Sequence, residues 1–444
     1  MRPAHRAGSQ ESGRWRPVAT RRRRLLALAQ IAAAALVAGC ESASTLAVHI
    51  NVDHRASPFD SPVAISVSGL EPGERITLSA SATGCSGLTW VSNDAFTADS
   101  SGNVDPANEA PTSGSYQGKQ TMGLLWSLTP RVAFTHDETM CVPSGGLSVS
   151  VVAEVKGQPR ASITLTRLAT AIGVREQELR PSTAGFYGDY FAPRPGSVIR
   201  PGVVIFGGSE GGLSTATEAG LLASHGYPTL ALAYFGEPGL PQTLQKVPLE
   251  YFATALRWLA QQPGVDGRRL VVDGVSRGSE AALLLGVDFP QLVHAVIALV
   301  PDDVALCGIV PAVGVRSRCA GPAWTLGGNA LPYTNEFGNP YPADQPEAVI
   351  QVEHIRGPIL LDCGGDDLVW PSCSFEGAIQ QRLNAANFAF THELFTYTDA
   401  GHGVGYSVPY DPTFVVADGG TSATTELARE DFWPMQLAFL AAIP

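Results

Sequence analysis

Positive charge is scarce over most of this chain of 444 residues, and this shortage excludes one large class of partners. Residues 1–39 hold eight arginines and one glutamate, so the rest of the chain holds 21 basic against 40 acidic residues, a net charge of −19. The phosphate backbone of a nucleic acid repels such a surface. We therefore expect no nucleic-acid partner.

Motifs for metals and phosphates are also missing. The chain has no CxxC pair and no cluster of cysteine with histidine, so the sequence predicts no metal site. The glycine-rich stretch FGGSEGGL, residues 206–213, lacks the Gly-Lys-Ser/Thr ending and the GxGxxG spacing of phosphate-binding loops. We expect no cofactor. Hydrophobic residues make up 45% of the chain and charged residues 16%, which is typical of a globular protein.

The amino terminus lacks an apolar run long enough to cross a membrane. Leu25–Val37 is apolar but shorter than the roughly 20 residues that a membrane span needs. It follows four arginines, residues 21–24, and small residues come after it, which predicts a secretory signal over residues 1–39. Its end, Val-Ala-Gly-Cys at 37–40, resembles a bacterial lipobox. That resemblance implies an exported protein of the bacterial cell envelope, anchored to a membrane through lipidated Cys40. A plain signal peptide with an incidental cysteine is the alternative.

Six further cysteines form an even set. In an exported protein an even number of cysteines favours disulfides, and six cysteines allow 15 pairings. Neighbourhood in the sequence favours three pairs, with free buried thiols as the alternative. The three pairs are Cys85 with Cys141, Cys307 with Cys319, and Cys363 with Cys373.

The first part of the mature chain is predicted to be all-β. Residues 40–58 are polar, and we expect a linker without regular structure there. Residues 59–160 contain short runs of alternating apolar and polar residues, such as SPVAISVSGLEPGERITLSASATG, with the turn signal Glu-Pro-Gly at 71–73. Evenly spaced short strands with such turns predict an immunoglobulin-like β-sandwich domain.

Residues 161–444 have a different pattern. Buried strands alternate with helices, which predicts an α/β fold with a doubly wound, parallel sheet. The expected strands lie at 201–208, 227–236, 268–275, 293–301, 357–365 and 390–397, and the first expected helices at 215–226 and 249–265.

The stretch Gly274-Val275-Ser276-Arg277-Gly278 joins one of these strands to a helix-like run. A GxSxG pattern alone arises easily by chance. Between a buried strand and a helix, however, it predicts a nucleophilic serine on a sharp turn, as in the α/β-hydrolase fold. A serine hydroxyl needs a base, and the base needs an orienting acid, which follow in the order Ser, Asp or Glu, His.

His402 is the expected base. It follows the strand at 390–397 in Gly-His-Gly, a loop at the carboxyl end of a late strand, whereas the other histidines after Ser276 lie in or beside strands. For the acid, the strand at 357–365 runs into two aspartates. Asp367 is the first choice and Asp366 the second. Asp303, after the preceding strand, is a third option.

An acyl-transfer site of this kind also needs an oxyanion hole, two N–H groups that stabilise the negative oxygen of the intermediate. One expected donor is the amide of Arg277, the residue after the nucleophile. The other is expected from the loop at 206–213, with Ser209 or its neighbour Gly208 as the donor.

These blocks together resemble the acyl-CoA thioesterase and bile acid-CoA:amino acid N-acyltransferase family. FGGSEGG, GVSRGSEAALLLG, GGDDLVWPS and AGHG are similar to its hydrolase domain, and PVAISVSGLEPGERITLSA to its amino-terminal β-sandwich. The resemblance covers about residues 58–444 and implies Ser276, Asp367 and His402 as nucleophile, acid and base. Residues 307–353 match poorly, and we expect a substrate-facing cap there.

The resemblance implies a serine hydrolase of the acyl-CoA thioesterase type that cleaves a thioester or ester of a fatty-acyl-like, small-molecule substrate. Hydrolytic members of this family carry serine at the nucleophile position and amino-acid-conjugating members carry cysteine, so Ser276 favours hydrolysis. Carboxylesterase activity, acyl transfer to an amine and a non-catalytic envelope binding protein remain alternatives. Nothing in the sequence indicates the oligomeric state.

Overall fold

The structure, a computed structural model, describes residues 47–312 and 315–444, and these belong to one compact unit. The expected signal segment, residues 1–39, and Cys40 lie outside the described residues. Within the described ranges, no helix has both the length and the hydrophobicity that a membrane span needs.

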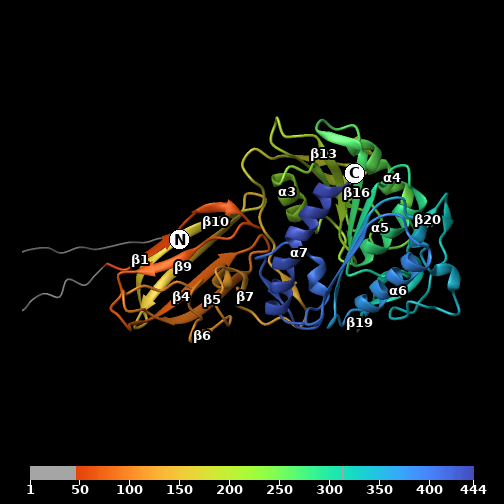
Figure 1. Cartoon of the computed structure of the whole chain (residues 1–444). Helices are drawn as coiled ribbons and strands as arrows, with labels where there is room; N and C mark the ends of the chain where they lie inside the picture. Colours follow the sequence, from red (N-terminus) through yellow and green to blue (C-terminus); the bar gives the residue numbers. More distant parts are fainter. Residues whose placement is uncertain (1–46, 313–314) are drawn as a thin grey trace, which may run out of the picture. The chain divides into compact units, whose positions relative to one another are not determined.

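The amino-terminal part is a sheet domain (Figure 1). Its main sheet has the order β2-β10-β9-β4-β5-β6, with β7 also paired to β5, while β1 and β3 form a separate antiparallel pair. Side chains along β4 and β9 alternate between buried and more exposed, which confirms the predicted period of two. The strands are β1 (His49–Val52), β2 (Ala56–Pro58), β3 (Ile65–Ser68), β4 (Arg75–Thr83), β5 (Thr89–Thr97), β6 (Ser113–Gly114), β7 (Thr129–Pro130), β9 (Leu147–Val155) and β10 (Gln158–Leu168).

The structure differs from the expectation in three respects here. Residues 47–58, expected as linker, contribute β1 and β2, because their backbone groups pair with β3 and β10. The expected boundary between residues 160 and 161 falls inside β10, which stays paired with β9 as far as Arg167. The domain has one large sheet and one small strand pair, rather than two sheets of similar size.

The second part is built on an eight-stranded sheet with the order β11-β12-β14-β13-β16-β17-β22-β23. The pairings from β14 to β23 are parallel, and β11 and β12 add an antiparallel edge. The predicted α/β class is confirmed. The strands are β11 (Arg175–Leu179), β12 (Tyr187–Ala192), β13 (Arg200–Phe206), β14 (Thr229–Ala233), β16 (Val265–Val275), β17 (Ala295–Leu299), β22 (Ile359–Gly364) and β23 (His392–Tyr397).

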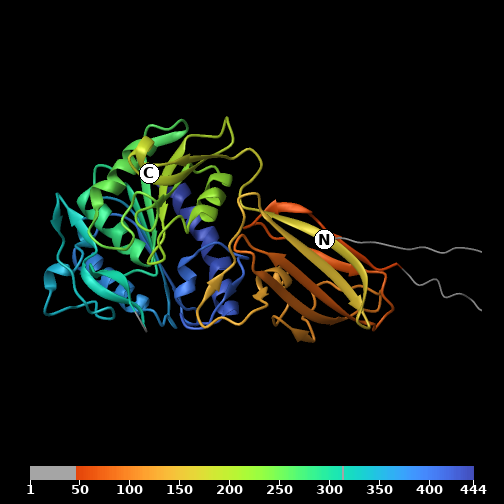
Figure 2. The ribbon, with the colours of Figure 1, turned by 180° about the vertical axis from the view of Figure 1, so that it is seen from behind.

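Helices cover both faces of this sheet (Figures 1 and 2). On β13, Val203 and Ile205 belong to one hydrophobic core, which includes residues of α3 and α7, whereas Val204 and Phe206 belong to a second core, which includes residues of α4, α5 and α6. Both faces of the central strands are therefore apolar, as a doubly wound sheet requires. The helices are α3 (Ala216–Ser224), α4 (Leu249–Leu259), α5 (Arg277–Asp288), α6 (Ser372–Ala385) and α7 (Ser422–Ala442).

Smaller elements complete the chain. They are α1 (Gly123–Trp126), β8 (Glu138–Thr139), α2 (Pro181–Ala184), β15 (Val247–Pro248), β18 (Cys307–Ala312), β19 (Val315–Pro322), β20 (Trp324–Leu326), β21 (Asn329–Ala330), η1 (Pro346–Ala348), η2 (Val352–His354), η3 (His402–Gly405) and β24 (Thr413–Phe414). β18 and β19 form a hairpin, and β20 pairs with β15 and β21. The first half of the expected cap is thus a set of short strands.

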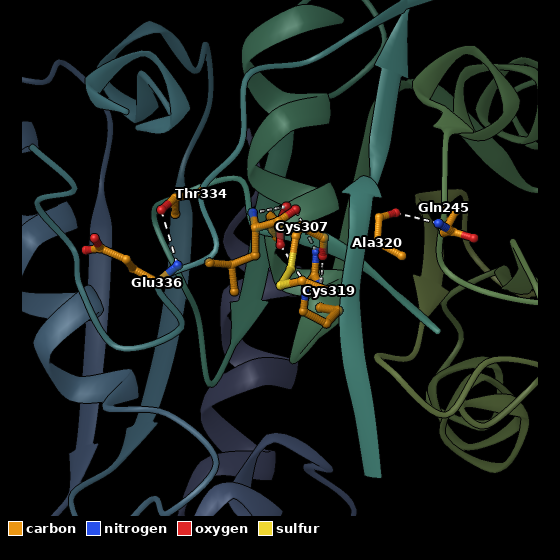
Figure 3. The surroundings of a disulfide bond; sticks show 9 residues. Gln245, Cys307, Cys319, Ala320, Thr334 and Glu336 are labelled. Carbon is orange, nitrogen blue, oxygen red and sulfur yellow. Dashed lines mark hydrogen bonds and ion pairs between the residues drawn. A yellow bond between two sulfur atoms is a disulfide. The ribbon is translucent and has the colours of Figure 1, made fainter. Parts of the chain in front are cut away.

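Three disulfides join the predicted cysteine pairs. The Cα atoms of Cys85 and Cys141 are 5.3 Å apart, and the second bond, between Cys307 and Cys319, links β18 to β19 at a Cα separation of 5.5 Å (Figure 3). The third bond, Cys363–Cys373, closes the loop between β22 and α6 at a Cα separation of 5.0 Å. The pairings expected from sequence neighbourhood are confirmed.

Removal of the third bond is expected to destabilise the protein measurably. Its cysteines are 10 residues apart, and releasing a loop of that length gives the unfolded chain entropy worth about 3 kcal/mol. The double variant Cys363→Ala/Cys373→Ala should therefore lose about this much free energy of unfolding in urea titrations. The pair Cys307→Ala/Cys319→Ala, at a separation of 12 residues, should lose a similar amount. A loss below about 0.5 kcal/mol in the first variant would contradict the assignment of a constraining bond.

Candidate active site

Ser276 stands at a sharp turn between β16 and α5. Its φ is 56° and its ψ is −124°, a conformation that residues with a side chain rarely adopt. A Cβ on Gly274 would come within 2.2 Å of the carbonyl oxygen of Gly278, and a Cβ on Gly278 within 2.5 Å of that of Gly207. Both glycines of the GxSxG pattern are therefore required by close backbone contacts, as expected for a strained serine turn.

His402 lies beside this serine. It begins η3, after β23, and its side chain is almost fully buried. Its Nε2 is 2.9 Å from Oγ of Ser276, and its Nδ1 is 2.8 Å from Oδ2 of Asp367. Because a carboxylate only accepts hydrogen bonds, Nδ1 carries the proton and Nε2 is left to accept the serine hydroxyl. The ring of Trp370 packs edge-on against the imidazole, with 5.0 Å between ring centroids.

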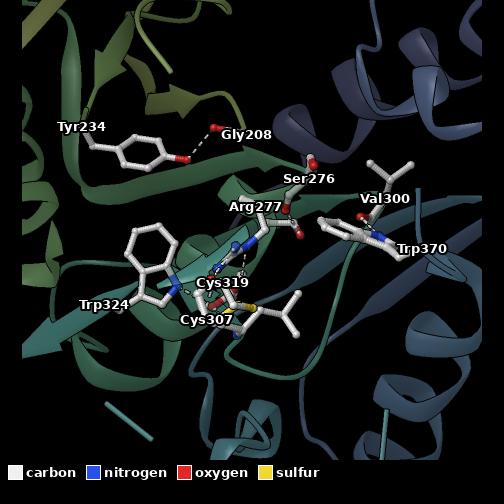
Figure 4. Close-up of polar contacts among 12 residues, drawn as sticks. Gly208, Tyr234, Ser276, Arg277, Val300, Cys307, Cys319, Trp324 and Trp370 are labelled. Atoms are coloured by element: carbon white, nitrogen blue, oxygen red, sulfur yellow. Dashed lines mark hydrogen bonds and ion pairs between the residues drawn. A yellow bond between two sulfur atoms is a disulfide. The ribbon is translucent and has the colours of Figure 1, made fainter. Parts of the chain in front are cut away.

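Asp367 is held in place by its own loop. Its Oδ1 accepts the amides of Val369 at 2.9 Å and Trp370 at 3.2 Å, and its side chain is fully buried. The indole of Trp370 in turn donates to the carbonyl of Val300 (Figure 4). These bonds aim the remaining carboxylate oxygen at His402.

The two alternative acids lie elsewhere. Asp366 accepts the amide of Gly420 at 2.9 Å, so it serves as a loop contact. Asp303 is buried with an oxygen 3.7 Å from a guanidinium nitrogen of Arg382, and burial raises the pKa of Asp303 to about 7. Neither carboxyl contacts His402 in the structure.

The loop after β13 reaches the serine from the other side. A Cβ on Gly208 would lie 2.7 Å from the Cβ of Ser276, so this position needs glycine for close approach. Tyr234 holds the loop, because its hydroxyl proton is shared between the carbonyls of Gly207 at 2.9 Å and Gly208 at 3.1 Å. Figure 4 shows the contact with Gly208. The amide of Gly208 donates to Oε1 of Glu210 at 2.9 Å. Gly208 is therefore not a free donor, and of the two expected residues in this loop Ser209 is the one left.

Arg277 contributes the expected backbone amide, and its side chain makes buried contacts that the sequence did not predict. Its N–H is the first of α5, and the first N–H groups of a helix have no partner within the helix. Its guanidinium, fully buried, donates to Glu280 at 2.8 Å and to the carbonyls of Cys307 and Leu306 at 3.0 and 3.2 Å. Glu280 also accepts from the amide of Leu306 and the indole of Trp324. This buried ion pair ties the serine turn to the start of β18 (Figure 4).

Sequence reasoning missed the side chains of Arg277, Glu280 and Glu210. The spacing of Arg277 and Glu280, three residues apart on a helix, is a signal for an ion pair. It does not show that the pair is buried. Glu210 gave no signal, because a glutamate in a glycine-rich loop is usually exposed.

A cavity of about 620 Å³ opens at the serine. Ser276, His402 and Ser209 line it, together with Asp137 and residues 139–142 of the sheet domain and residues of α3. A second cavity of about 210 Å³ is lined by residues 309–311 of β18 and shares Ser209 and Glu210 with the first. Within the described ranges, no group of three His, Cys, Asp or Glu side chains could hold a metal ion.

The stability of this part of the protein should fall as the pH rises. Burial disfavours the charged form of five carboxyl groups and raises the pKa of each: Glu218, Glu376 and Asp411 to about 7, and Asp362 and Glu426 to about 8. In the unfolded chain such groups titrate near pH 4. The folded state therefore binds more protons between about pH 4 and pH 8, and the free energy of unfolding decreases across that window.

We expect a lower midpoint of urea unfolding at about pH 8.5 than at about pH 5.5. The variant Asp362→Asn should reduce this difference, because its amide cannot ionise. An equal or higher midpoint at the alkaline pH would contradict the prediction.

Comparison with known proteins places the chain in a family. Residues 60–181 match the model of the acyl-CoA thioester hydrolase/BAAT N-terminal region, and residues 247–442 match that of the BAAT/acyl-CoA thioester hydrolase C terminal. Acyl-coenzyme A thioesterase 6 of Mus musculus is 29% identical over 407 residues, which are 85% of this chain and 92% of that protein. Bile acid-CoA:amino acid N-acyltransferase of Mus musculus is 33% identical over 255 residues, which are 55% of this chain and 60% of that protein.

Solved structures resemble the chain less closely. A putative dienelactone hydrolase from Klebsiella pneumoniae is 19% identical with a TM-score of 0.42, and covers 61% of this chain and 99% of that one. A TM-score of 0.42 is too low to serve as evidence for the fold beyond the strand order described above. Both family regions are nevertheless present in one chain, in order, and the protein belongs to the acyl-CoA thioester hydrolase/BAAT family of enzymes.

Proposed function

We propose that the protein is a serine hydrolase that cleaves a carboxylic thioester or ester through an acyl-enzyme. The observation that carries this proposal is the hydrogen-bonded series from Ser276 through His402 to Asp367, with distances of 2.9 and 2.8 Å. It stands at the carboxyl ends of parallel strands, beside a cavity large enough for a small acyl substrate.

The reaction follows from these positions. His402 Nε2 takes the hydroxyl proton of Ser276 as Oγ attacks the carbonyl carbon, and Asp367 stabilises the imidazolium that forms. The amides of Arg277 and Ser209 stabilise the oxyanion of the tetrahedral intermediate. His402 then returns the proton to the leaving thiolate or alkoxide. A water molecule, activated by the same imidazole, releases the acid from Ser276.

A fluorophosphonate probe tests the proposal directly, because it labels only an activated serine. Wild-type protein should be labelled, while Ser276→Ala should not. A matched control is Ser279→Ala, three residues further along α5, whose hydroxyl donates to the carbonyl of Ser276 rather than to His402. Absence of label in folded wild type would overturn the proposal in favour of a binding protein without catalysis.

Acyl transfer to an amine is the second candidate, supported by the 33% identity to an N-acyltransferase. Both reactions share the acyl-enzyme and differ only in whether water or an amine resolves it. Turnover with glycine added as the amine, followed by mass spectrometry of products, distinguishes them. Free acid alone supports hydrolysis, and an acyl amide supports transfer.

We further propose that the protein is exported and anchored to a membrane of the bacterial cell envelope through a lipid on Cys40. The support is the lipobox-like sequence at residues 37–40 together with three disulfides, which persist in oxidising compartments. Wild-type protein should be found in the membrane fraction and incorporate labelled palmitate, whereas Cys40→Ala should do neither. Equal fractionation of both proteins would reject the anchor.

A further inference from the structure

The cavity at Ser276 is markedly acidic. It is the site already described, because it contains Ser276 and His402, and its charge bears on which substrate can enter. Five carboxyl side chains line it: Asp137, Glu210, Glu218, Asp411 and Asp418. Among the described residues that line it, none is a lysine or an arginine.

The guanidinium groups of Arg277, which follows Ser276, and of Arg429, which bonds to Gly403 beside His402, are not available to a substrate. Arg277 is fully buried and bonded to Glu280 and two carbonyls. Arg429, only 1% exposed, donates to the carbonyl of Gly403 at 2.7 Å and to the hydroxyl of Thr413 at 2.9 Å. Neither guanidinium can offer the open, fork-shaped contact with which arginine binds phosphate.

Glu210 is the most exposed of the five acidic residues that line the cavity, so its carboxylate is the one most accessible to a leaving group. It follows Ser209, the proposed oxyanion donor, and it lines both the larger cavity and the second one beside it. Its Oε1 accepts from the amide of Gly208 at 2.9 Å and from the hydroxyl of Ser214 at 2.5 Å. These bonds fix the carboxylate of Glu210, which lines both cavities.

The 3′-phosphate and diphosphate of coenzyme A carry several negative charges. Burial raises the pKa of Glu218 and of Asp411 to about 7, so these two of the five lining carboxyl groups are partly protonated at neutral pH and reach full charge only at higher pH. A site lined by carboxylates repels the phosphates of coenzyme A, while it accepts an uncharged leaving group and attracts a cation. We propose that this enzyme acts on acyl thioesters or esters whose leaving group is uncharged or positively charged, and that it discriminates against coenzyme A esters. The proposal rests on the serine-hydrolase function proposed above and names its substrate class.

Three thioesters with one acyl group test this selectivity. S-butyryl-N-acetylcysteamine is uncharged, S-butyrylthiocholine is cationic and butyryl-CoA is anionic, and all three release a thiol that a disulfide reagent detects. We expect kcat/KM for butyryl-CoA to be about tenfold or more below that for the uncharged thioester. The value for S-butyrylthiocholine should be at least equal to that for the uncharged thioester. Added salt should narrow the gap, because it screens charge.

Two failures can be told apart. If butyryl-CoA has the highest kcat/KM, the selectivity is wrong and the hydrolase function stands. If no thioester is turned over faster by wild type than by Ser276→Ala, and the fluorophosphonate probe does not label, then the hydrolase function and the selectivity both fall.

A variant locates the cause. Glu210→Gln keeps an oxygen for the amide of Gly208 and removes the charge, so kcat/KM for butyryl-CoA should rise several-fold relative to the uncharged thioester. Glu393→Gln is the matched control. It removes one carboxylate near the amino end of β23, whereas Ser276 lies at the carboxyl ends of the parallel strands. The ratio of kcat/KM for butyryl-CoA to that for the uncharged thioester should stay unchanged. An unchanged ratio in Glu210→Gln would overturn the role of this carboxylate.

Among the hairpin residues whose side chains the structure describes, Arg318 is the cation that competes with this proposal. Arg318, exposed, pairs across the β18–β19 hairpin with Val310, which lines the second cavity. If Arg318→Gln lowers kcat/KM for butyryl-CoA and spares the uncharged thioester, a phosphate contact exists and the proposed discrimination is wrong. Equal kinetics in this variant support the proposal.

Discussion

Replacing His402 by alanine should lower kcat by a factor on the order of 10⁶, because Ser276 then has no base within reach. Asp367→Asn should lower kcat by a factor on the order of 10⁴. An asparagine amide can donate to Nδ1 and thereby move the imidazole proton to Nε2, where it blocks acceptance from Ser276. Both effects are on kcat, since neither side chain is placed to bind the substrate in its ground state.

Asp366→Asn is the matched control for the acid. It is the neighbouring residue, carries the same chemical change, and contacts the amide of Gly420 instead of His402. Its kcat should stay within a few-fold of wild type. Steady-state kinetics on S-butyryl-N-acetylcysteamine measure all three variants. A larger loss in Asp366→Asn than in Asp367→Asn would reassign the acid and leave the base untouched.

Arg277→Ala should destabilise the protein by about 3–5 kcal/mol, the cost of leaving one partner of a buried ion pair alone. Both side chains of the pair with Glu280 are fully shielded from solvent. Truncation leaves the carboxylate of Glu280 without its cation, and it removes the donors to the carbonyls of Leu306 and Cys307. The free energy of unfolding in urea measures the loss.

Two further variants separate the ion pair from general damage. Arg277→Met/Glu280→Gln removes both charges, fills the space and keeps an acceptor for the indole of Trp324, so it should recover much of the lost stability. Arg268→Ala changes a side chain that is 93% exposed, and its effect should stay within about 0.5 kcal/mol. If the double variant is no more stable than Arg277→Ala, unpaired charge is not the cause.

The central strands could be predicted because each carries its own signal. VVIF and LVV, residues 203–206 and 270–272, are apolar on both faces, which only a strand covered by helices on both sides accommodates. The edge strand β11 has the sequence REQEL with only its last residue buried, so it had no hydrophobic signal. Its pairing with β12 depends on a partner later in the chain, and the sequence pattern does not contain that information.

In the candidate site, too, some residues could be predicted from the sequence and others depended on the tertiary structure. Ser276, His402 and their order along the chain could be predicted, because a serine between glycines and a Gly-His-Gly loop each follow a recognisable strand. For the acid, the sequence favours Asp367 over Asp366 but leaves the final choice open, since both are loop aspartates after β22. It depends on which carboxylate the loop amides of Val369 and Trp370 turn towards His402.

The sequence by itself determined the α/β class, the alternation of the amino-terminal strands, the cysteine pairs, and Ser276 and His402 of the candidate site. These follow from short-range features: hydrophobic period, turn residues, and nearness along the chain. Only the tertiary structure decided that Glu210 occupies the Gly208 amide, that Arg277 and Glu280 are buried together, and that five carboxyl groups line the cavity at Ser276 and His402. Each of these features depends on side chains that are far apart in the sequence but close in space. Their distances determine desolvation and electrostatic interactions, and no single segment of the sequence specifies those distances.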